Sequence, residues 1–358
     1  MDHFKDSAQL LDNLTCPAFV VKEGVIVNVN QSAAQHNIEC NTNIQNIISI
    51  GTEEYNRFQD GKLCLTLTIN EISYNAVVTA TDDLHIFCLT SDYEDAELRA
   101  YALAAMNLRE PLSNAMLNTE QLLPNESIQS DPQVMQMLAQ VNRNLHQLLR
   151  AIGNMSDTAA YANQRSFRMQ TRDVVSVIEE ILDKTADLVE SSGKTLNYKL
   201  PSKAIYSLID AEKLERAILN LISNAMKYTS ENGKLDVELR QNNHMLILTI
   251  QDNGQGITPQ VRGNLFTRFL REPGIEDGRN GIGLGLSIVR SVASAHGGTV
   301  LFEQPDNCGA RITMTMSIQK PTGTVLHDQI KLPIEYTGGR DHALLELSDV
   351  LPDTLYSK

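Results

Sequence analysis

The spacing of hydrophobic and polar residues differs between successive parts of the chain, and each spacing predicts a different kind of structure. Residues 1 to about 90 alternate short apolar runs with polar turns, and the apolar runs lie at 18–21, 24–27, 63–67 and 85–89. Short β-branched runs between turn residues are typical of strands. The pattern predicts a small α+β domain over residues 1–91.

Residues 92–165 show a helical pattern. Apolar residues recur at alternating steps of four and three in two stretches: Leu98, Tyr101, Ala105, Leu108, Leu112, Ala115, Thr119 and Leu122, then Val134, Leu138, Val141, Leu145, Leu148, Ile152, Met155 and Ala159. These seams predict two helices joined by PNESIQSDPQ. A lone hairpin leaves its seams exposed, so we expect a homodimer in which two hairpins form a four-helix bundle.

Candidate chemistry begins with NLISNAMKYT at 220–229. Asn220, Asn224 and Lys227 share one edge of a predicted amphipathic helix, beside a stripe of apolar residues between Leu214 and Ala225. An amide oxygen suits Mg²⁺, and an ammonium group neutralises phosphate charge. The alternative is an ordinary solvated helix edge.

DNGQG at 252–256 directly follows the apolar run 245–250, which predicts a buried strand. The Asp252 carboxylate can accept a hydrogen bond from the exocyclic amine of a base. Gly254 and Gly256 would let a flat ring lie against the backbone. An ordinary Asp-Asn-Gly turn is the alternative.

GIGLGLSIV at 281–289 has glycine at Gly281, Gly283 and Gly285, followed by a helical pattern from Leu284. Such a loop lets phosphates approach bare amides at a helix N-terminus. Its spacing is neither a Rossmann turn nor a P-loop. A glycine-rich turn without a ligand is the alternative.

In this order and spacing, the three segments and LFTRF, which contains Phe266 and Phe269, resemble the N, glycine and F boxes of the histidine-kinase ATP-binding domain. The resemblance implies an α/β sandwich over residues 166–319 and a lid near 270–283. It also implies an ATP site that includes Tyr228 and Leu284, with Asn224 as the Mg²⁺ ligand.

The resemblance extends to gyrases, the large heat-shock chaperones and mismatch-repair ATPases, which carry a Glu where this chain has Asn220. That Glu activates water. Because an amide cannot accept a proton at neutral pH, the pocket is better suited to phosphoryl transfer than to hydrolysis.

The first predicted helix resembles the histidine-kinase phosphoacceptor box, His-Glu-Leu-Arg-Thr-Pro-Leu, but its chemical positions differ. The chain reads MNLREPL at 106–112, so Met106 replaces the acceptor His, Asn107 the acidic residue and Glu110 the Thr associated with phosphatase activity. A thioether cannot be phosphorylated by this chemistry. We expect His146 on the second helix to be a partly exposed structural histidine and not a replacement acceptor.

At the two ends, the order of strand signals in residues 1–91 resembles a PAS sensor domain, and residues 320–358 form a C-terminal extension. A short apolar segment at 343–347 predicts that this extension docks on a neighbouring surface, with a disordered tail as the alternative. We assign no chemistry to the Arg340-Asp341-His342 trio.

Composition restricts partners and location. The net charge of -14 and pI near 5.0 argue against nucleic acid, which requires a basic face. No apolar run has the length of a membrane span and the N-terminus lacks the form of a signal peptide, so we expect a cytoplasmic protein. The five cysteines contain no CxxC pair and favour buried, reduced thiols.

Two functions of different classes follow. The first is a cytosolic sensor histidine kinase-like protein of two-component signalling that binds ATP and Mg²⁺, with a receiver domain of a response regulator or a partner histidine kinase as the second protein. The second is a pseudokinase, an ATP-responsive dimeric scaffold that regulates its partner by contact. A stand-alone ATPase is disfavoured by Asn220.

Overall fold

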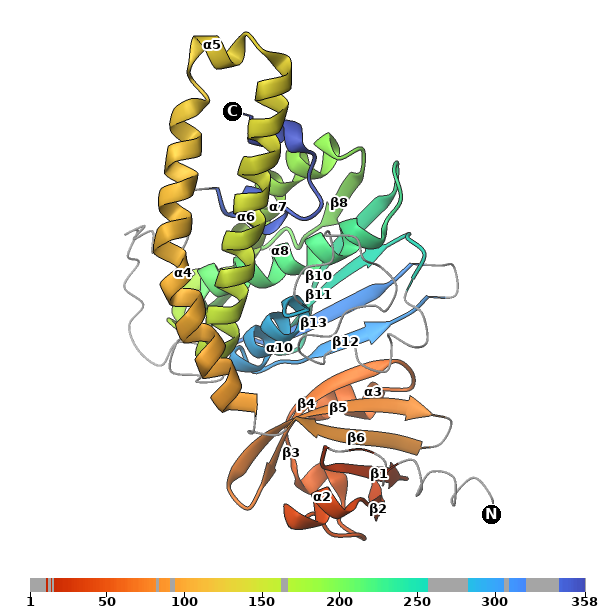
Figure 1. Ribbon diagram of the computed structural model, residues 1–358. Coiled ribbons are helices and arrows are strands. Elements are labelled where there is room, and N and C mark those ends of the chain that lie inside the picture. The colour runs from red at the N-terminus through yellow and green to blue at the C-terminus, as the bar shows by residue number, and fades with distance from the viewer. Residues whose placement is uncertain are drawn as a thin grey trace.

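The structure is a computed structural model that describes residues 11, 14, 16–81, 84–90, 94–161, 167–256, 283–305, 309–319 and 341–357. Figure 1 shows a β-rich N-terminal part, a pair of long helices and an α/β part, with the C-terminal segment lying against the helices. The expectation of a mixed α/β protein is confirmed.

The N-terminal part is an antiparallel sheet with short helices. Its strands lie in the order β2-β1-β6-β5-β4, with β3 paired to β4. The elements are β1 (Ala18–Lys22), β2 (Val25–Val29), α2 (Gln31–Gln35), η1 (Ile44–Asn46), β3 (Ile48–Ile50), α3 (Thr52–Arg57), β4 (Lys62–Ile69), β5 (Ile72–Thr81) and β6 (Leu84–Thr90). Phe19, Leu63 and Phe87 are fully buried in its core.

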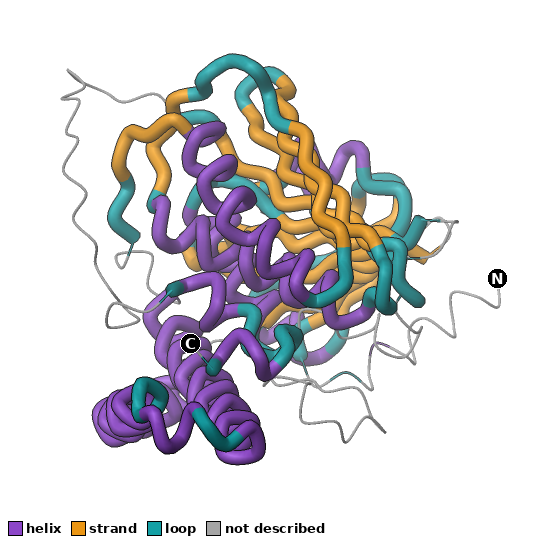
Figure 2. The backbone as a smooth tube through the Cα atoms, turned by 90° about the horizontal axis from the view of Figure 1, so that it is seen from above, coloured by secondary structure: helices purple, strands orange, loops and turns teal. Residues whose placement is uncertain are grey.

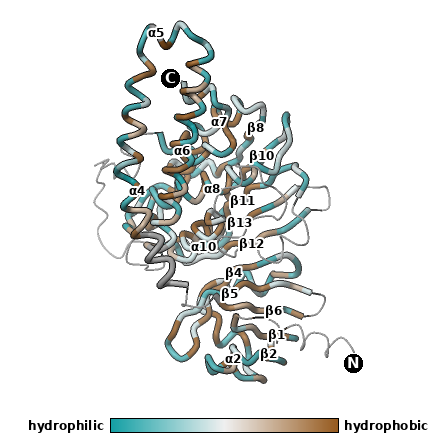
Figure 3. Tube along the Cα trace, viewed as in Figure 1, coloured by the Kyte–Doolittle hydropathy of each residue, from teal (hydrophilic) through white to brown (hydrophobic). Residues whose placement is uncertain are grey.

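Two long helices, α4 (Glu94–Leu122) and α6 (Pro132–Tyr161), lie side by side, and the one-turn helix α5 (Glu126–Gln129) lies in their connection (Figure 1). Met116 and Leu149 are buried between them. Apolar residues recur along both helices (Figure 3). Many of them stay exposed: Leu103, Met106, Leu108, Leu117, Leu122, Met137, Val141 and Leu148.

The α/β part has a five-stranded mixed sheet in the order β12-β13-β11-β10-β8, in which only β8 and β10 run parallel. Its helices cover one face of this sheet (Figure 2). The elements are β7 (Gln170–Asp173), α7 (Val174–Ser191), β8 (Thr195–Lys199), β9 (Tyr206–Ile209), α8 (Ala211–Tyr228), β10 (Lys234–Asn242), β11 (Met245–Asp252), α10 (Gly285–Ala295), β12 (Val300–Glu303) and β13 (Arg311–Ser317). The strands β7 and β9 form a separate pair.

The two sheets meet edge to edge. Leu63 and Lys62 of β4 pair with Leu301 and Phe302 of β12, which joins the N-terminal sheet to the α/β sheet. Beside this joint, Thr66 of β4 hydrogen-bonds Ser294 near the end of α10 at 3.4 Å. The N-terminal part therefore contacts the helix that begins at the glycine-rich loop.

The C-terminal segment, residues 341–357, contains α11 (His342–Glu346) and η3 (Asp353–Tyr356) and packs on α6, α7 and α8. Tyr356 is 1% exposed, and its ring lies across His146 of α6 at 5.0 Å between centroids. Its carbonyl accepts a hydrogen bond from Asn142 at 3.0 Å.

Two expectations, on the cysteines and on His146, need correction. Of the four cysteines that the structure describes, only Cys64 is buried, because Cys40 lies on an exposed turn, Cys16 precedes β1 and is half-buried, and Cys88 lies in β6 and is half-buried. His146 is 5% exposed and not partly exposed, because the C-terminal segment covers it. In the described part of the chain, no helix is long and apolar enough to cross a membrane.

Candidate nucleotide-binding site

The helix α8 forms the floor of the candidate site. Asp210 caps its N-terminus by accepting a hydrogen bond from the Lys213 amide at 3.1 Å. The predicted apolar stripe is buried against the sheet. This packing fixes the direction of the edge that carries Asn220, Asn224 and Lys227, which runs along the same helix.

Asn220 lies at the buried end of this edge, with 1% of its surface exposed. Its side-chain amide donates to the Arg216 carbonyl at 2.9 Å. Its Oδ1 lies against Gly285, where an added Cβ would stand 2.8 Å away. The NLISNAMKYT segment and the GIGLG segment therefore meet, as the sequence resemblance implies.

Asn224 and Lys227 are half-buried and lie one and two turns further along α8. Among the described residues, the Asn224 side chain makes no hydrogen bond, so its oxygen is available to a ligand. The Lys227 ammonium lies 5.3 Å from the Tyr228 ring centroid. An available amide oxygen and a nearby ammonium group fit a cation bound to phosphate.

Asp252 lies at the end of β11. The strand continues through Asp252, two residues beyond the predicted run, because its backbone pairs with Ala310 at 3.0 Å. Its Oδ1 accepts hydrogen bonds from the amides of Gly254 at 2.9 Å and Ala310 at 3.2 Å. Burial raises the pKa of this carboxyl, and the two amide hydrogen bonds oppose the shift.

The DNGQG segment is packed against the end of α8. A Cβ on Gly254 would clash with the Tyr228 carbonyl, and the Gln255 amide donates to that carbonyl at 3.3 Å. Gly256 has φ +72, a conformation that favours glycine. Glycine is therefore required here by close approach and by backbone geometry together.

The GIGLG segment is described from Gly283 onward. Gly283 has φ +71, and α10 begins at Gly285 with no side-chain cap at Leu284. The Leu284 side chain therefore does not cap the first amides of α10. A phosphate site requires such amides, because they donate hydrogen bonds to the phosphate oxygens. Gly281, the LFTRF segment and the predicted lid near 270–283, apart from Gly283 itself, lie outside the described residues.

The phosphoacceptor-box positions lie on the surface of α4, away from this floor. Met106 is 62% exposed, and Asn107 and Glu110 are also exposed. Pro111 lies inside the helix and has no amide proton to donate. The ring of His146 is fixed in place by a hydrogen bond between its Nδ1 and the Asn142 carbonyl at 2.8 Å.

Sequence reasoning singled out His146 of α6 but missed the row of buried polar residues to which it belongs: Asn142, His146, Arg150, Asn154 and Thr158. They recur at every fourth position, which places them on one helix face. That spacing could have identified a docking face, because polar residues that are buried on a helix need partners.

Arg150 is the centre of this row. Its guanidinium forms ion pairs with Glu346 at 3.2 Å and with Asp349, both in the C-terminal segment. It also donates to the Ser223 hydroxyl at 3.1 Å and to Asn220 at 3.5 Å. Arg150 therefore joins α6, the C-terminal segment and α8.

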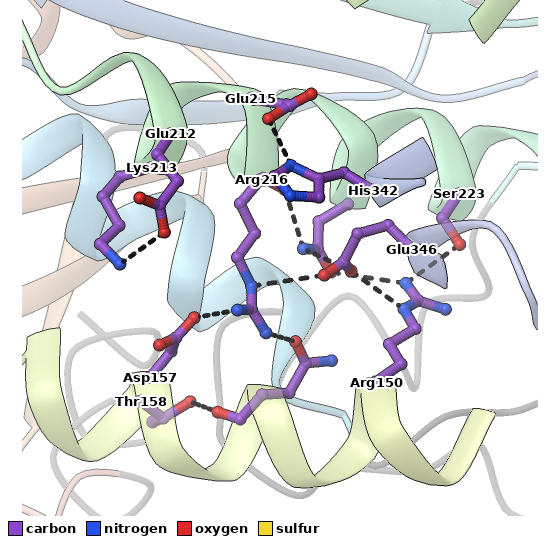
Figure 4. Close-up of polar contacts among 12 residues, drawn as sticks. Arg150, Asp157, Thr158, Glu212, Lys213, Glu215, Arg216, Ser223, His342 and Glu346 are labelled. Carbon is purple, nitrogen blue, oxygen red and sulfur yellow. Dashed lines mark hydrogen bonds and ion pairs between the residues drawn. The ribbon is translucent and has the colours of Figure 1, made fainter. Parts of the chain in front are cut away.

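Arg216 of α8 is the second buried cation. It pairs with Asp157 of α6 and lies 3.4 Å from Glu346, and it donates to Asn154 at 2.9 Å. Figure 4 shows Glu346 between the two arginines. We call Arg150, Asp157, Arg216, Glu346 and Asp349 the two-arginine cluster.

Comparison with known proteins identifies the α/β part. Residues 209–320 match the family described as "Histidine kinase-, DNA gyrase B-, and HSP90-like ATPase". The chain is 30% identical over 265 residues, 68% of its length, to "Sensor histidine kinase TmoS" of Ectopseudomonas mendocina. It is 28% identical over 221 residues, 61% of its length, to "Sensor histidine kinase RppB" of Synechocystis sp..

The chain spans 27% and 48% of the lengths of these two relatives. Among solved structures, full-length ShkA in complex with AMPPNP aligns with a TM-score of 0.52 at 19% identity, over 62% of this chain and 46% of that chain. This likeness shows a shared fold. Together the matches confirm the resemblance to the sensor histidine kinase family.

Proposed function

We propose, on the premise that residues 209–320 belong to the histidine kinase-, DNA gyrase B-, and HSP90-like ATPase family, that this chain binds Mg-ATP for phosphoryl transfer in two-component signalling. In this proposal residues 1–91 are a PAS-like sensor, 92–165 a dimerisation hairpin, 166–319 the ATP-binding domain and 320–358 a C-terminal extension. The signalling partner is a response-regulator receiver domain or a second histidine kinase.

The described residues fit the nucleotide. The available oxygen of Asn224 suits Mg²⁺, and among the described residues no group of acidic, His or Cys side chains forms an alternative metal site. Only Oδ1 of Asp252 is used by hydrogen bonds within the described part, so Oδ2 can accept from a base amine. Lys227, Gly283 and the start of α10 would hold the phosphates.

ATP would supply a γ-phosphoryl group, with Mg²⁺ neutralising charge as it leaves. The chain's own contribution is to bind, orient and exclude water. Asn220 is 1% exposed and is an amide, so it cannot act as a base on water. This favours phosphoryl transfer over hydrolysis.

The pseudokinase alternative is favoured by a specific observation. Met106 occupies the acceptor position on the exposed face of α4, with Asn107 in place of the acidic residue that assists proton transfer and Glu110 in place of the Thr associated with phosphatase activity. No phosphoryl group can be accepted there. In the kinase reading, the group goes to a histidine of a partner, and in the pseudokinase reading nucleotide binding changes only contacts with that partner.

We further propose that the chain is a homodimer. Exposed apolar residues on both long helices, including Leu108, Val141 and Leu148, leave a surface that a second copy would cover. A symmetric pair of hairpins would bury both seams.

The observation that carries the proposal is the contact between Asn220 and Gly285 beside the Tyr228–Gly254 contact, because it supports one pocket built from three separate segments. The test measures calorimetric binding of ATP with Mg²⁺ by the wild type, Asn224→Ala and the surface control Asn46→Ala. We expect Asn224→Ala to lose the Mg²⁺-dependent part of binding and the control to keep it. Unchanged affinity in Asn224→Ala would remove the metal assignment, and no binding by the wild type would reject the proposal.

A second assay separates the two functions. The protein is incubated with γ-labelled ATP and Mg²⁺, alone and with candidate receiver domains or partner kinases, and the acid lability of any label is measured. Label on the partner that depends on this chain favours the kinase. Binding without transfer favours the pseudokinase, and acid-labile label on this chain would contradict our reading of Met106.

A further inference from the structure

The C-terminal segment contacts both sides of the boundary between α6 and the ATP-binding domain. Toward α6, Arg143 pairs with Asp353 at 2.8 Å and donates to the carbonyls of Ser348 and Asp349. Toward α8, His342 contacts Glu215 at 2.8 Å. The segment therefore bridges two parts of the molecule and is not confined to one of them.

Glu346 is the buried anchor of this bridge. It is 0% exposed and contacts both Arg150 of α6 and Arg216 of α8. A buried carboxylate between two buried guanidinium groups is a costly contact to break, because its removal takes one of two charge partners from each arginine, leaving Arg150 with Asp349 and Arg216 with Asp157. Figure 4 shows these side chains converging from three elements.

The same anchor reaches the nucleotide site. The Asn220 amide donates to Glu346 at 3.5 Å, and Asn220 Oδ1 accepts from Arg150 at 3.5 Å. Asn220 is the residue that lies against Gly285 of the phosphate loop. With the C-terminal segment docked, its side chain is covered and its hydrogen bonds are satisfied.

Docking of the C-terminal segment changes the net charge beside the proposed nucleotide site. The two-arginine cluster contains two cations and three carboxylates, so it carries excess negative charge beside the place where a triphosphate would bind. Departure of the segment removes Glu346 and Asp349 and leaves two cations with one carboxylate. The local charge then favours an anion.

We propose that residues 341–357 are an autoinhibitory strap that fastens the ATP-binding domain to α6 and opposes nucleotide binding, so that nucleotide and strap compete. The inference rests on the proposed nucleotide site. It assigns Glu346 and Asp349 a role in setting nucleotide affinity beyond their part in holding the fold.

The test uses the full chain and calorimetric titration with Mg²⁺ and a non-hydrolysable ATP analogue. Glu346→Gln and Asp349→Asn each remove one negative charge while keeping side-chain size, and we expect nucleotide binding to become about fivefold tighter or more, a typical coupling between two sites. Unchanged or weaker binding would overturn the strap, since a purely structural role predicts weaker binding.

Because a substitution at the buried Glu346 could prevent folding, Asp353→Arg tests the strap at a residue that is not buried. This half-exposed residue pairs with Arg143 and is not part of the two-arginine cluster, so the change weakens docking of the strap without substituting a residue of the cluster, and tighter binding is again expected. The matched control is Glu190→Gln, an exposed carboxylate at the end of α7, for which affinity should not change.

A reciprocal measurement needs no variant. Because coupling acts in both directions, nucleotide should speed amide hydrogen exchange in residues 343–351 of the wild type, and unchanged or slower exchange would overturn the strap. Failure of the wild type and every variant to bind nucleotide would instead reject the proposed function, and the strap with it. Binding by the wild type with no gain in any variant rejects the strap alone.

Discussion

The amide oxygen of Asn220 lies 2.8 Å from the point where a Cβ on Gly285 would stand, although 65 residues separate them in the sequence. Real Cβ atoms do not approach an oxygen so closely. Glycine at 285 is therefore required by contact between α8 and the start of α10, and this contact brings the two segments of the proposed pocket together.

Gly285→Ala should separate α8 from the phosphate loop. Overpacking of this kind costs about 1–3 kcal/mol, and we expect nucleotide affinity to fall because the loop amides move. Calorimetric titration with Mg-ATP measures the effect. Ser291→Ala, two turns further along α10, introduces alanine outside the site and should leave affinity unchanged. Equal affinity in Gly285→Ala and the wild type would contradict the assignment of this loop.

Asp252→Asn tests the base-binding position. The Gly254 and Ala310 amides can still donate to the asparagine oxygen, so the fold should persist, while nucleotide affinity should fall by about 1–3 kcal/mol for loss of the charged acceptor. Folding is checked by thermal unfolding and affinity by titration. A variant that binds as tightly as the wild type would show that Asp252 does not contact the base.

Because the pKa of Asp252 is raised, nucleotide affinity should depend on pH. Acceptance of a hydrogen bond from a base amine requires the carboxylate, so wild-type affinity should fall as pH decreases through this pKa, which burial holds above the usual value for Asp. The measurement is nucleotide affinity across acidic pH for the wild type and Asp252→Asn. The loss should be absent in the variant, and an equal loss in both proteins would assign the titration to another group.

The loss of unfolding free energy on removing an ion-pair partner should be larger for a buried pair than for an exposed one. The Arg216 side chain is 3% exposed, and its removal takes the ion-pair partner from Asp157 and leaves Glu346 with Arg150 alone, so Arg216→Ala should cost about 3–5 kcal/mol of unfolding free energy. The Lys184–Glu180 pair is 60% and 59% exposed, and Lys184→Ala should cost about 0–1 kcal/mol. Urea denaturation compares them. Similar losses would mean that the two-arginine cluster is open to water.

The sequence predicted the ATP-binding part well because its signals are local. The Leu214–Ala225 stripe fixed the face of α8, and Met245–Ile250 fixed the core of β11, since both follow from the periodicity of burial. The helix predicted from Leu284 begins at Gly285. The site residues themselves remain predictions until nucleotide binding is measured.

The two-arginine cluster could not be predicted in the same way. Arg150 and Glu346 of this cluster are 196 residues apart in the sequence. The apolar seam of α6 dominated its periodicity, so the polar row on the neighbouring face was not recognised. The prediction that His146 is partly exposed was wrong for the same reason, because Tyr356, from the C-terminal segment, covers it. The spacing of the polar row marks a docking face on α6 and the apolar segment 343–347 marks a docking segment, but neither pattern says which residues pair, because that depends on tertiary docking.

The His342–Glu215 contact makes docking of α11 depend on pH. The hydrogen bond to Glu215 raises the pKa of His342 most, Glu212 and Asp341 raise it further, and burial opposes them. A raised pKa stabilises the docked form below the unfolded value, about 6.5, and this contribution is lost as pH rises through the folded value. Amide exchange of residues 343–347 should therefore speed up with pH beyond its intrinsic increase, and His342→Asn should remove the excess.

The exposed apolar residues of the hairpin predict where two copies meet. Leu148 is 54% exposed and shares a face of α6 with Met137 and Val141. Burial of such a side chain contributes about 1.5–3 kcal/mol, and a symmetric dimer would bury it in both copies. Leu148→Glu should therefore shift sedimentation equilibrium toward monomer. Ile72→Glu is the matched control, because Ile72 is 51% exposed but lies on the N-terminal sheet, away from both helices. A monomeric wild type would contradict the homodimer, and equal masses for the wild type and Leu148→Glu would show that Leu148 does not lie in its interface.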